Sequence, residues 1–175
     1  MIMTVDELKR FISTDKPDAV LEAMLQALEL AIRGYTNNNF QDRGYRTDAD
    51  IRGSLFAAEA LQPFDEGDTV QVSRSQFNNG LYVVTEATDA TFKVAESLHD
   101  ENDVLVTKVS YPSDVKFGAA KMIQWELNNG SKVGIQSETI SRHSVTYFNM
   151  DDDNSIMGYP KSLTGFLKPY RKARC

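Results

Sequence analysis

The sequence of 175 residues has one cysteine, two histidines and no long hydrophobic run. A single cysteine, Cys175, cannot form an intrachain disulfide, and such sparing use fits a reducing compartment. No stretch approaches the roughly 18 apolar residues of a membrane-spanning helix. Residues 1–10 carry acids where a secretory signal would carry bases before an apolar run. These absences predict a soluble, cytoplasmic product.

The residue spacing also lacks the groupings on which most enzymes depend. His99 and His143 stand in no His-x-x-x-His pattern and there is no Cys-x-x-Cys pair, so a structural zinc site is not expected. Gly130-Ser131-Lys132 lacks the earlier glycine of a phosphate-binding loop. A cysteine at the last position is not typical of a nucleophile. We therefore expect a protein that is not an enzyme, with no cofactor and no metal.

One alternative remains open, because Asp151–Asp153 and His143 each have two interpretations. The acidic run is either a site for Ca²⁺ or Mg²⁺, which prefer oxygen ligands, or a solvated turn. It lacks the glycine and later glutamate of a calcium-binding loop. His143 is either a general base beside Glu138 or Asp151, or an exposed strand residue. The functional interpretations together describe a small metal-dependent hydrolase.

Composition and net charge limit the remaining classes of fold and function. With 41% hydrophobic residues the chain has material for a core, and a chain of this length buries about two-thirds of its unfolded surface. The net charge of −6 argues against binding nucleic acid over the whole surface, since phosphate neutralisation needs clustered bases. One such cluster lies at the end, in Lys168, Arg171, Lys172 and Arg174. It is either a local contact patch or a solvated tail.

The first third of the sequence has helical spacing. Thr4 and Glu7 are spaced as in a capping box, ahead of a short apolar face from Val5 to Ile12. Apolar residues then recur at helical intervals from Leu21 to Ile32, and Gly34 is a typical helix stop. We expect a polar loop over residues 35–50 and a second helix over residues 51–62.

The hydrophobic period falls from about 3.6 residues to about 2 after Pro63. Strand candidates are Val70–Val72, Leu81–Val84, Thr91–Val94 and Val104–Val109, with a turn at Asn79-Gly80 and a hairpin connection at Ala87–Ala90. Several short strands with tight turns predict a small antiparallel sheet or barrel.

Helical spacing returns after Pro112. Ser113 is a candidate N-cap for a helix that carries Val115 and Ile123 on one side. Residues 133–148 alternate loosely and predict an extended hairpin, while residues 163–170 predict a short amphipathic helix.

The expected fold class is therefore α+β: a small helical bundle with an inserted antiparallel β-sheet or barrel module and a C-terminal hairpin plus short helix. The bundle would comprise residues 1–62 and 112–175, and the inserted module residues 63–111. Insertions of this kind succeed where the two chain ends lie close together at the surface.

The segment 135–171 resembles tailed-bacteriophage head–tail connector proteins, also called adaptors or head-completion proteins. The resemblance lies in the run Ile135-Gln-Ser-Glu-Thr-Ile-Ser-Arg-His-Ser-Val-Thr-Tyr147, then Gly158-Tyr159-Pro160, then residues 163–171. That family shows a Ser-Glu-x-Ile-Gly and Ser-x-Thr-Tyr hairpin before a short helix that ends near Leu-x-Pro-Tyr-Arg. Ser141 stands where glycine is usual, and the β module departs from a family form that is nearly all helical.

The resemblance implies a structural adaptor of the phage neck. Copies would assemble as a dodecameric ring on the portal protein, extend the DNA channel and present a surface to the next neck (stopper) or tail protein. DNA would pass through without specific binding, and an acidic channel wall would let it slide. The protein would be found in the virion neck, after assembly in the host cytoplasm. The alternative within this class is another neck or tail-completion protein that binds the tail side.

The resemblance also places a portal-docking site in the C-terminal segment. Its aromatic and apolar residues would be buried anchors, and its bases would meet an acidic portal surface, because interface hot spots favour Tyr and Arg. The residues are Tyr159, Pro160, Leu163, Phe166, Leu167, Tyr170, Arg171, Lys172 and Arg174. The spacing of the apolar residues alone equally allows this stripe to pack on the chain's own core.

Overall fold

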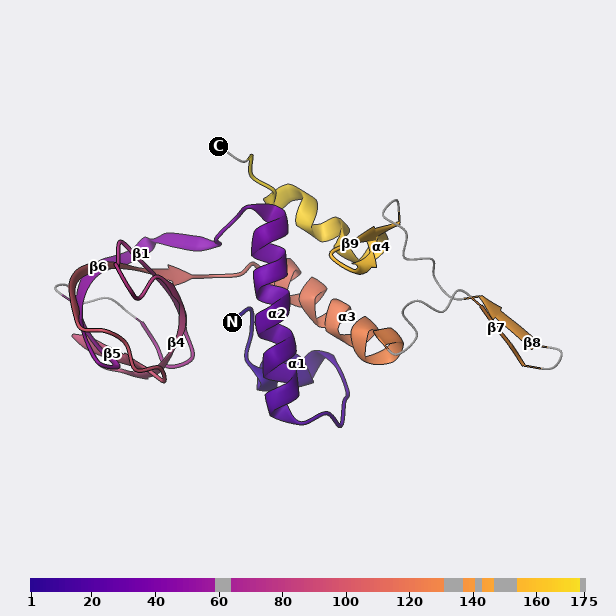
Figure 1. Cartoon of the computed structure of the whole chain (residues 1–175), viewed down its shortest axis with the longest axis horizontal. Coiled ribbons are helices and arrows are strands. Elements are labelled where there is room, and N and C mark those ends of the chain that lie inside the picture. The colour runs from indigo at the N-terminus through magenta and orange to yellow at the C-terminus, as the bar shows by residue number, and fades with distance from the viewer. Residues whose placement is uncertain (59–63, 131–136, 141–142, 147–153, 174–175) are drawn as a thin grey trace. The chain divides into compact units, whose positions relative to one another are not determined.

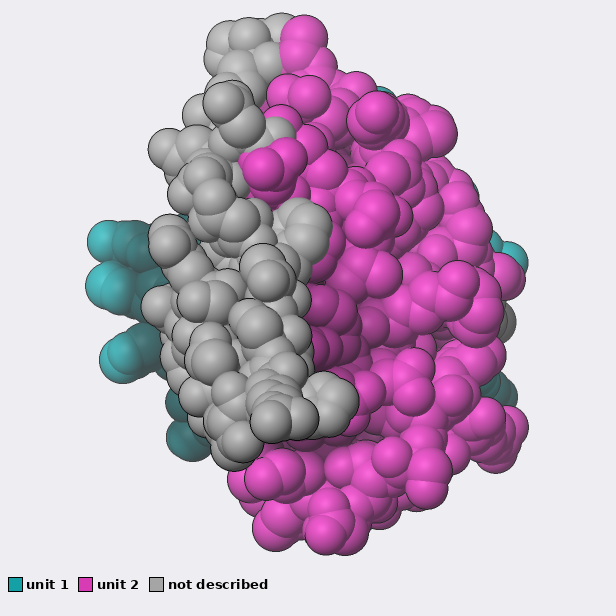
Figure 2. All heavy atoms as spheres, turned by 90° about the vertical axis from the view of Figure 1, so that its right-hand side faces the viewer, with its two compact units in different colours: residues 1, 39–111 teal, residues 2–38, 112–175 magenta. Residues whose placement is uncertain are grey.

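The computed structural model of the chain describes residues 1–58, 64–130, 137–140, 143–146 and 154–173. For residues 137–140 and 143–146 it describes the backbone, and for the other ranges the side chains as well. These residues form two compact units, coloured separately in Figure 2. The barrel unit comprises residue 1 and residues 39–111. The helical unit comprises residues 2–38 and 112–175.

The barrel unit is a closed barrel of six antiparallel strands (Figure 1). Around the barrel the order of the strands is β1-β2-β5-β4-β3-β6. The strands are β1 Gln41–Arg52, β2 Leu55–Ala58, β3 Thr69–Ser73, β4 Gly80–Ala87, β5 Thr91–Val94 and β6 Glu101–Val109. Closure pairs β1 with both β2 and β6, so that neither end of the sheet is left as an open edge.

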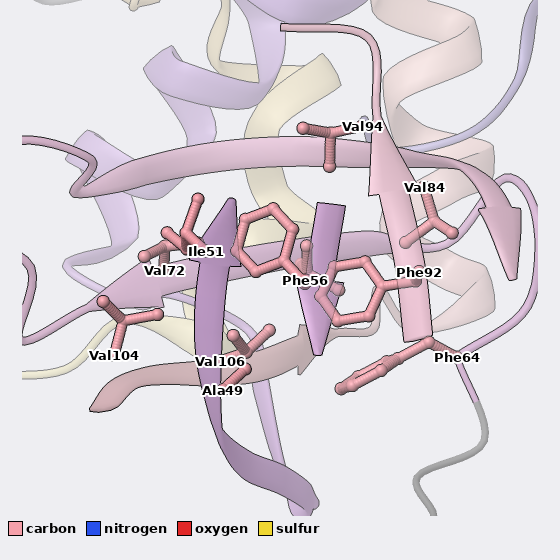
Figure 3. Close-up of a cluster of buried hydrophobic side chains, with 11 residues drawn as sticks. Ala49, Ile51, Phe56, Phe64, Val72, Val84, Phe92, Val94, Val104 and Val106 are labelled. Atoms are coloured by element: carbon pink, nitrogen blue, oxygen red, sulfur yellow. The ribbon is translucent and has the colours of Figure 1, made fainter. Parts of the chain in front are cut away.

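The barrel encloses a hydrophobic core of its own, drawn in Figure 3. Phe56 stacks on Phe92 with ring centroids 4.5 Å apart, and Phe64 meets Phe92 edge-on at 5.1 Å. The core comprises Ala49, Ile51, Phe56, Phe64, Val70, Val72, Val84, Phe92, Val94, Val104 and Val106. Three aromatic rings among aliphatic side chains fill the interior, which is therefore a packed core rather than a channel.

The prediction of a small helical bundle as the fold is wrong, because the closed barrel accounts for a large part of the chain. The predicted loop over residues 35–50 and helix over residues 51–62 contain β1 and β2 instead. The buried positions of β1 are Thr47, Ala49 and Ile51. Only one of these three is a large apolar residue, so the alternation of apolar and polar residues that indicates a strand is weak here. The barrel unit therefore begins at residue 39, whereas the sequence placed the module's start at residue 63.

The two ends of the barrel unit lie side by side. The backbone N–H of Ser110 donates to the carbonyl of Phe40 at 2.9 Å, and Gln41 pairs with Val109. The Phe40 and Tyr111 rings contact each other with centroids 4.7 Å apart. A unit whose ends meet in this way can be inserted in another fold without separating the flanking helices.

The helical unit is built from three longer helices and a C-terminal segment (Figure 1). Its helices are α1 Val5–Phe11, α2 Asp18–Thr36, α3 Ser113–Asn129 and α4 Lys161–Thr164, the last continued by a 3-10 helix, η2, over Gly165–Tyr170. Its short strands are β7 Ser137–Ile140, β8 His143–Thr146, β9 Ser155–Ile156 and β10 Tyr159–Pro160. No helix in the described part of the chain is both long and apolar enough to cross a membrane.

The helix ends follow the sequence only in part. The Thr4 hydroxyl accepts from the Glu7 backbone N–H at 3.1 Å as predicted, but the Glu7 carboxylate bonds Lys116. Gly34 does not end α2, which continues to Thr36. Asn37 provides the left-handed residue there, with φ of 49°. At α3, Ser113 is the first helical residue and does not act as a side-chain cap.

Candidate partner-binding segment

The Gly-Tyr-Pro motif of the C-terminal segment lies at a tight turn. Strands β9 and β10 pair through Tyr159 with Ile156 and through Pro160 with Ser155. The two turn residues, Met157 and Gly158, both have positive φ, of 56° and 78°. Two left-handed residues are what a two-residue hairpin turn requires, so Gly158 serves the backbone here.

Tyr159 anchors this turn on α3. Its ring meets the Trp125 ring edge-on, with centroids 5.6 Å apart. Burial raises the pKa of the Tyr159 hydroxyl well above its usual range, and the charge and hydrogen bond of Glu126 raise it further.

The apolar residues of α4 and η2 pack within the helical unit. Leu167 is fully buried, Pro160 is buried, and Leu163 is half-buried. The Phe166 ring lies so close to Gly118 of α3 that a Cβ added there would be 2.3 Å from it. The structure thus favours self-packing of this stripe over its use as a set of exposed anchors.

Tyr170 ties the end of η2 to the start of α3. Its hydroxyl donates to both carboxylate oxygens of Asp114, at 2.8 and 2.9 Å. That hydrogen bond, with a smaller contribution from burial and from the Asp114 charge, raises the pKa of Tyr170. Asp114 also lies in the first turn of α3, where a negative charge is favourable.

The basic end of the segment runs past the C-terminus of α2. The backbone N–H of Lys172 donates to the carbonyl of Thr36 at 2.8 Å, and the Asn37 side chain donates to the carbonyl of Ala173 at 2.8 Å. The Arg171 guanidinium lies 5.0 Å from the centre of the Tyr35 ring. Both Arg171 and Lys172 are exposed, so their charges face solvent.

The structure therefore divides the predicted docking residues. Arg171 and Lys172 are held in place by backbone and ring contacts yet leave their cationic groups accessible. The apolar and aromatic residues instead make contacts within the helical unit. Arg174 lies outside the described residues.

Comparison with protein families and with curated sequences adds no relative. No protein-family model matches the chain, and no curated protein sequence matches it significantly. The interpretation of the site consequently depends on the residues themselves.

Sequence reasoning missed two contacts that position this segment. The first is the fit of Phe166 against Gly118, for which the small residues Gly118-Ala119-Ala120 in one predicted helix were the available signal. Small residues allow close approach of a neighbouring element. The second is the bond from Tyr170 to Asp114, which sequence spacing cannot reveal.

The alternative hydrolase hypothesis depends on residues that the structure does not describe. Asp151–Asp153 and the side chains of Glu138 and His143 lie outside what the structure describes. Among the residues it does describe, no group of three or more His, Cys, Asp or Glu side chains is arranged to hold a metal ion. His99 instead places its ring 5.2 Å from that of Phe77.

Proposed function

We propose that the protein is a structural adaptor of a tailed-phage neck, which assembles as a ring on the portal and connects the head to the tail. The observation that carries this proposal is the hairpin of β7 and β8. It pairs Ser137 with Thr146 and Glu138 with Val145, within the segment that resembles the connector family. The family pattern is a hairpin at this place, so the pairing supports the resemblance.

The order of the neighbouring elements supports the same proposal. The long helix α3 precedes the hairpin, and the Gly-Tyr-Pro turn and the short helices α4 and η2 follow it. This is the order that the resemblance implies. In this function the virion neck is the site of action, and DNA passes the ring without specific binding because the chain is acidic overall.

Portal docking in this proposal uses the exposed bases of the C-terminal segment. The Arg171 guanidinium is held over the Tyr35 ring, and the exposed Lys172 side chain extends from a backbone that is tied to α2, so two positive charges are presented close together. An acidic portal surface would be attracted to them. In this proposal the buried Leu167 and the partly buried Phe166 hold the segment on the helical unit and do not contact the portal.

The test is charge reversal at these bases. Deleting the segment would remove Leu167 from the core and unfold the helical unit, so the double variant R171E/K172E is the better choice. We expect its affinity for purified portal protein from the same genome to fall at least about tenfold at low salt. The loss should shrink at high salt, because exposed charges are screened.

Lys16→Glu is the matched control, since Lys16 is an exposed base of the same unit outside the segment. Portal binding that is equal for wild type, control and double variant would contradict the docking proposal. A pull-down that retains tail components but no portal would instead favour the tail-side alternative.

A further inference from the structure

The charge of the chain is divided unequally between its two units. The barrel unit has 13 Asp and Glu residues against 6 Lys and Arg, a net charge of −7. The helical unit has 12 against 13, a net charge of +1. Two copies that met barrel to barrel would repel each other, whereas a barrel that met a helical unit would not.

The barrel carries a rigid loop, residues 74–79, between β3 and β4, called here the Phe77 loop. The Glu101 carboxylate accepts from the Ser75 hydroxyl and from the Asn78 side-chain amide. Asn78 in turn bonds the backbone of His99 twice, at 2.9 and 3.0 Å. A loop held by so many bonds loses little conformational entropy when a partner binds it.

At the tip of this loop Phe77 has 63% of its surface exposed. Its ring leans on that of His99, with the centroids 5.2 Å apart. Below the tip, the Glu101 carboxylate accepts from the backbone N–H of Gln76 at 2.7 Å, and the Tyr82 hydroxyl donates to the Asn78 carbonyl at 3.0 Å. The loop therefore presents an exposed apolar tip, and the Glu101 carboxylate is in contact with the loop.

The helical unit exposes an aromatic surface that carries a positive charge. Phe11 of α1 and Phe117 of α3 are 45% and 48% exposed, and their rings meet edge-on with centroids 5.9 Å apart. The Lys121 ammonium lies 4.3 Å from the centre of the Phe117 ring. This aromatic patch, Phe11, Phe117 and Lys121, thus combines apolar surface with a positive charge.

We propose that the Phe77 loop of one copy docks on the aromatic patch of the next copy. A third ring would add to the edge-on pair, and the net negative charge of the barrel unit that carries the loop would favour its approach to Lys121. Each copy carries both surfaces, and two different complementary surfaces on one subunit make a head-to-tail contact, the type that builds a ring when the rotation between successive copies closes. This inference rests on the proposed ring adaptor function and names the surfaces that join its subunits.

The contact is tested by paramagnetic relaxation enhancement between copies. An unlabelled chain carries the substitutions Gln76→Cys and Cys175→Ser, and a nitroxide is attached to its one thiol, in the Phe77 loop. This chain is mixed with isotope-labelled chain that carries Cys175→Ser alone. We expect signal loss at the amides of residues 11, 117 and 121 of the labelled copy. No signal loss at the highest soluble concentration, or loss confined to other surfaces, would overturn the proposal.

A mixing experiment tests whether the contact is head-to-tail. Phe77→Ser and Phe117→Ser should each weaken self-association about tenfold or more, measured by sedimentation velocity. Their mixture should form a one-to-one dimer, because each variant keeps the surface that the other has lost. Tyr45→Ser on the barrel and Leu30→Ser on α2 are matched controls at exposed hydrophobic residues, and both should associate like wild type.

Single variants that associate like wild type, or a mixture that stays monomeric, would overturn the assignment of these surfaces. Circular dichroism of each variant checks that it is folded. The outcome is separable from that of the proposed function. Portal binding without this self-association would remove only the subunit contact, and self-association without portal binding would remove only the adaptor function.

Discussion

Glu101 shows how one carboxylate can organise a loop far from it in the sequence. Its oxygens accept from Ser75, from the backbone N–H of Gln76 at 2.7 Å and from Asn78 at 2.5 Å. These bonds, that of Ser75 above all, lower the pKa of Glu101. A lowered pKa in the folded state means that folding favours the charged form.

The sign of the pH dependence follows from this lowered pKa. The stabilisation is complete above the pKa that Glu101 has in the unfolded chain, and it is lost as the pH falls through the lower folded value. We therefore expect Glu101→Gln to lower the melting temperature by a few degrees at neutral pH, and the difference from wild type to shrink in acid. Thermal unfolding followed by circular dichroism across this pH range measures it. Glu96→Gln, a change at an exposed glutamate, is the control; an equal effect of both variants at every pH would contradict the role of Glu101.

At the scale of elements, helix α3 and the C-terminal segment pack closely because α3 has a glycine, Gly118, at the point of contact. Gly118 lies in the middle of α3, where alanine would ordinarily be the better helix former. The Phe166 ring occupies the space that an alanine Cβ would need. The close approach of the segment to α3 thus outweighs the local helix propensity.

Gly118→Ala should accordingly destabilise the helical unit by about 1–3 kcal/mol, the usual range for overpacking. Gly34→Ala is the matched control, because Gly34 lies in α2 and has nothing within 4 Å of an added Cβ. That change should stabilise the protein by about 0.5–1 kcal/mol. Urea unfolding measures both values. A stabilising effect of Gly118→Ala would show that Phe166 does not constrain α3.

For the whole molecule, the two units have separate hydrophobic cores. The cluster that fills the barrel consists of residues from Ala49 to Val106, and the buried residues of the helical unit come from α1, α2, α3 and η2. Phe56 and Leu25 are both fully buried, one in each core. A cavity in one core therefore removes contacts from that unit alone.

Phe56→Ala should destabilise the barrel unit by about 3–5 kcal/mol and Leu25→Ala the helical unit by about 2–5 kcal/mol. Hydrogen exchange measured by mass spectrometry should show the loss of protection confined to the unit that carries the substitution. Equal loss of protection in both units, from either variant, would show that the chain unfolds as one cooperative domain.

Much of the secondary structure was predictable because its signals are local. The apolar spacing from Leu21 to Ile32 indicated α2, and the strands β3 to β6 lie where residues 70–109 alternate or are rich in β-branched residues. The Thr4 cap was likewise visible as a spacing. These features depend on neighbours along the chain, which the sequence displays directly.

What those elements become depends on contacts between distant parts of the chain. Strand β1 has few large apolar residues, and it is a strand because closure of the barrel supplies pairing partners on both of its sides. Helix α2 passes Gly34 because Asn37 can take the left-handed conformation and the Thr36 carbonyl finds the backbone of Lys172. In the candidate site, local spacing was enough to establish that apolar residues and bases alternate near the end of the chain. Packing against α2 and α3 was needed to establish which of them face inward and which remain exposed to solvent, because burial depends on residues distant in sequence.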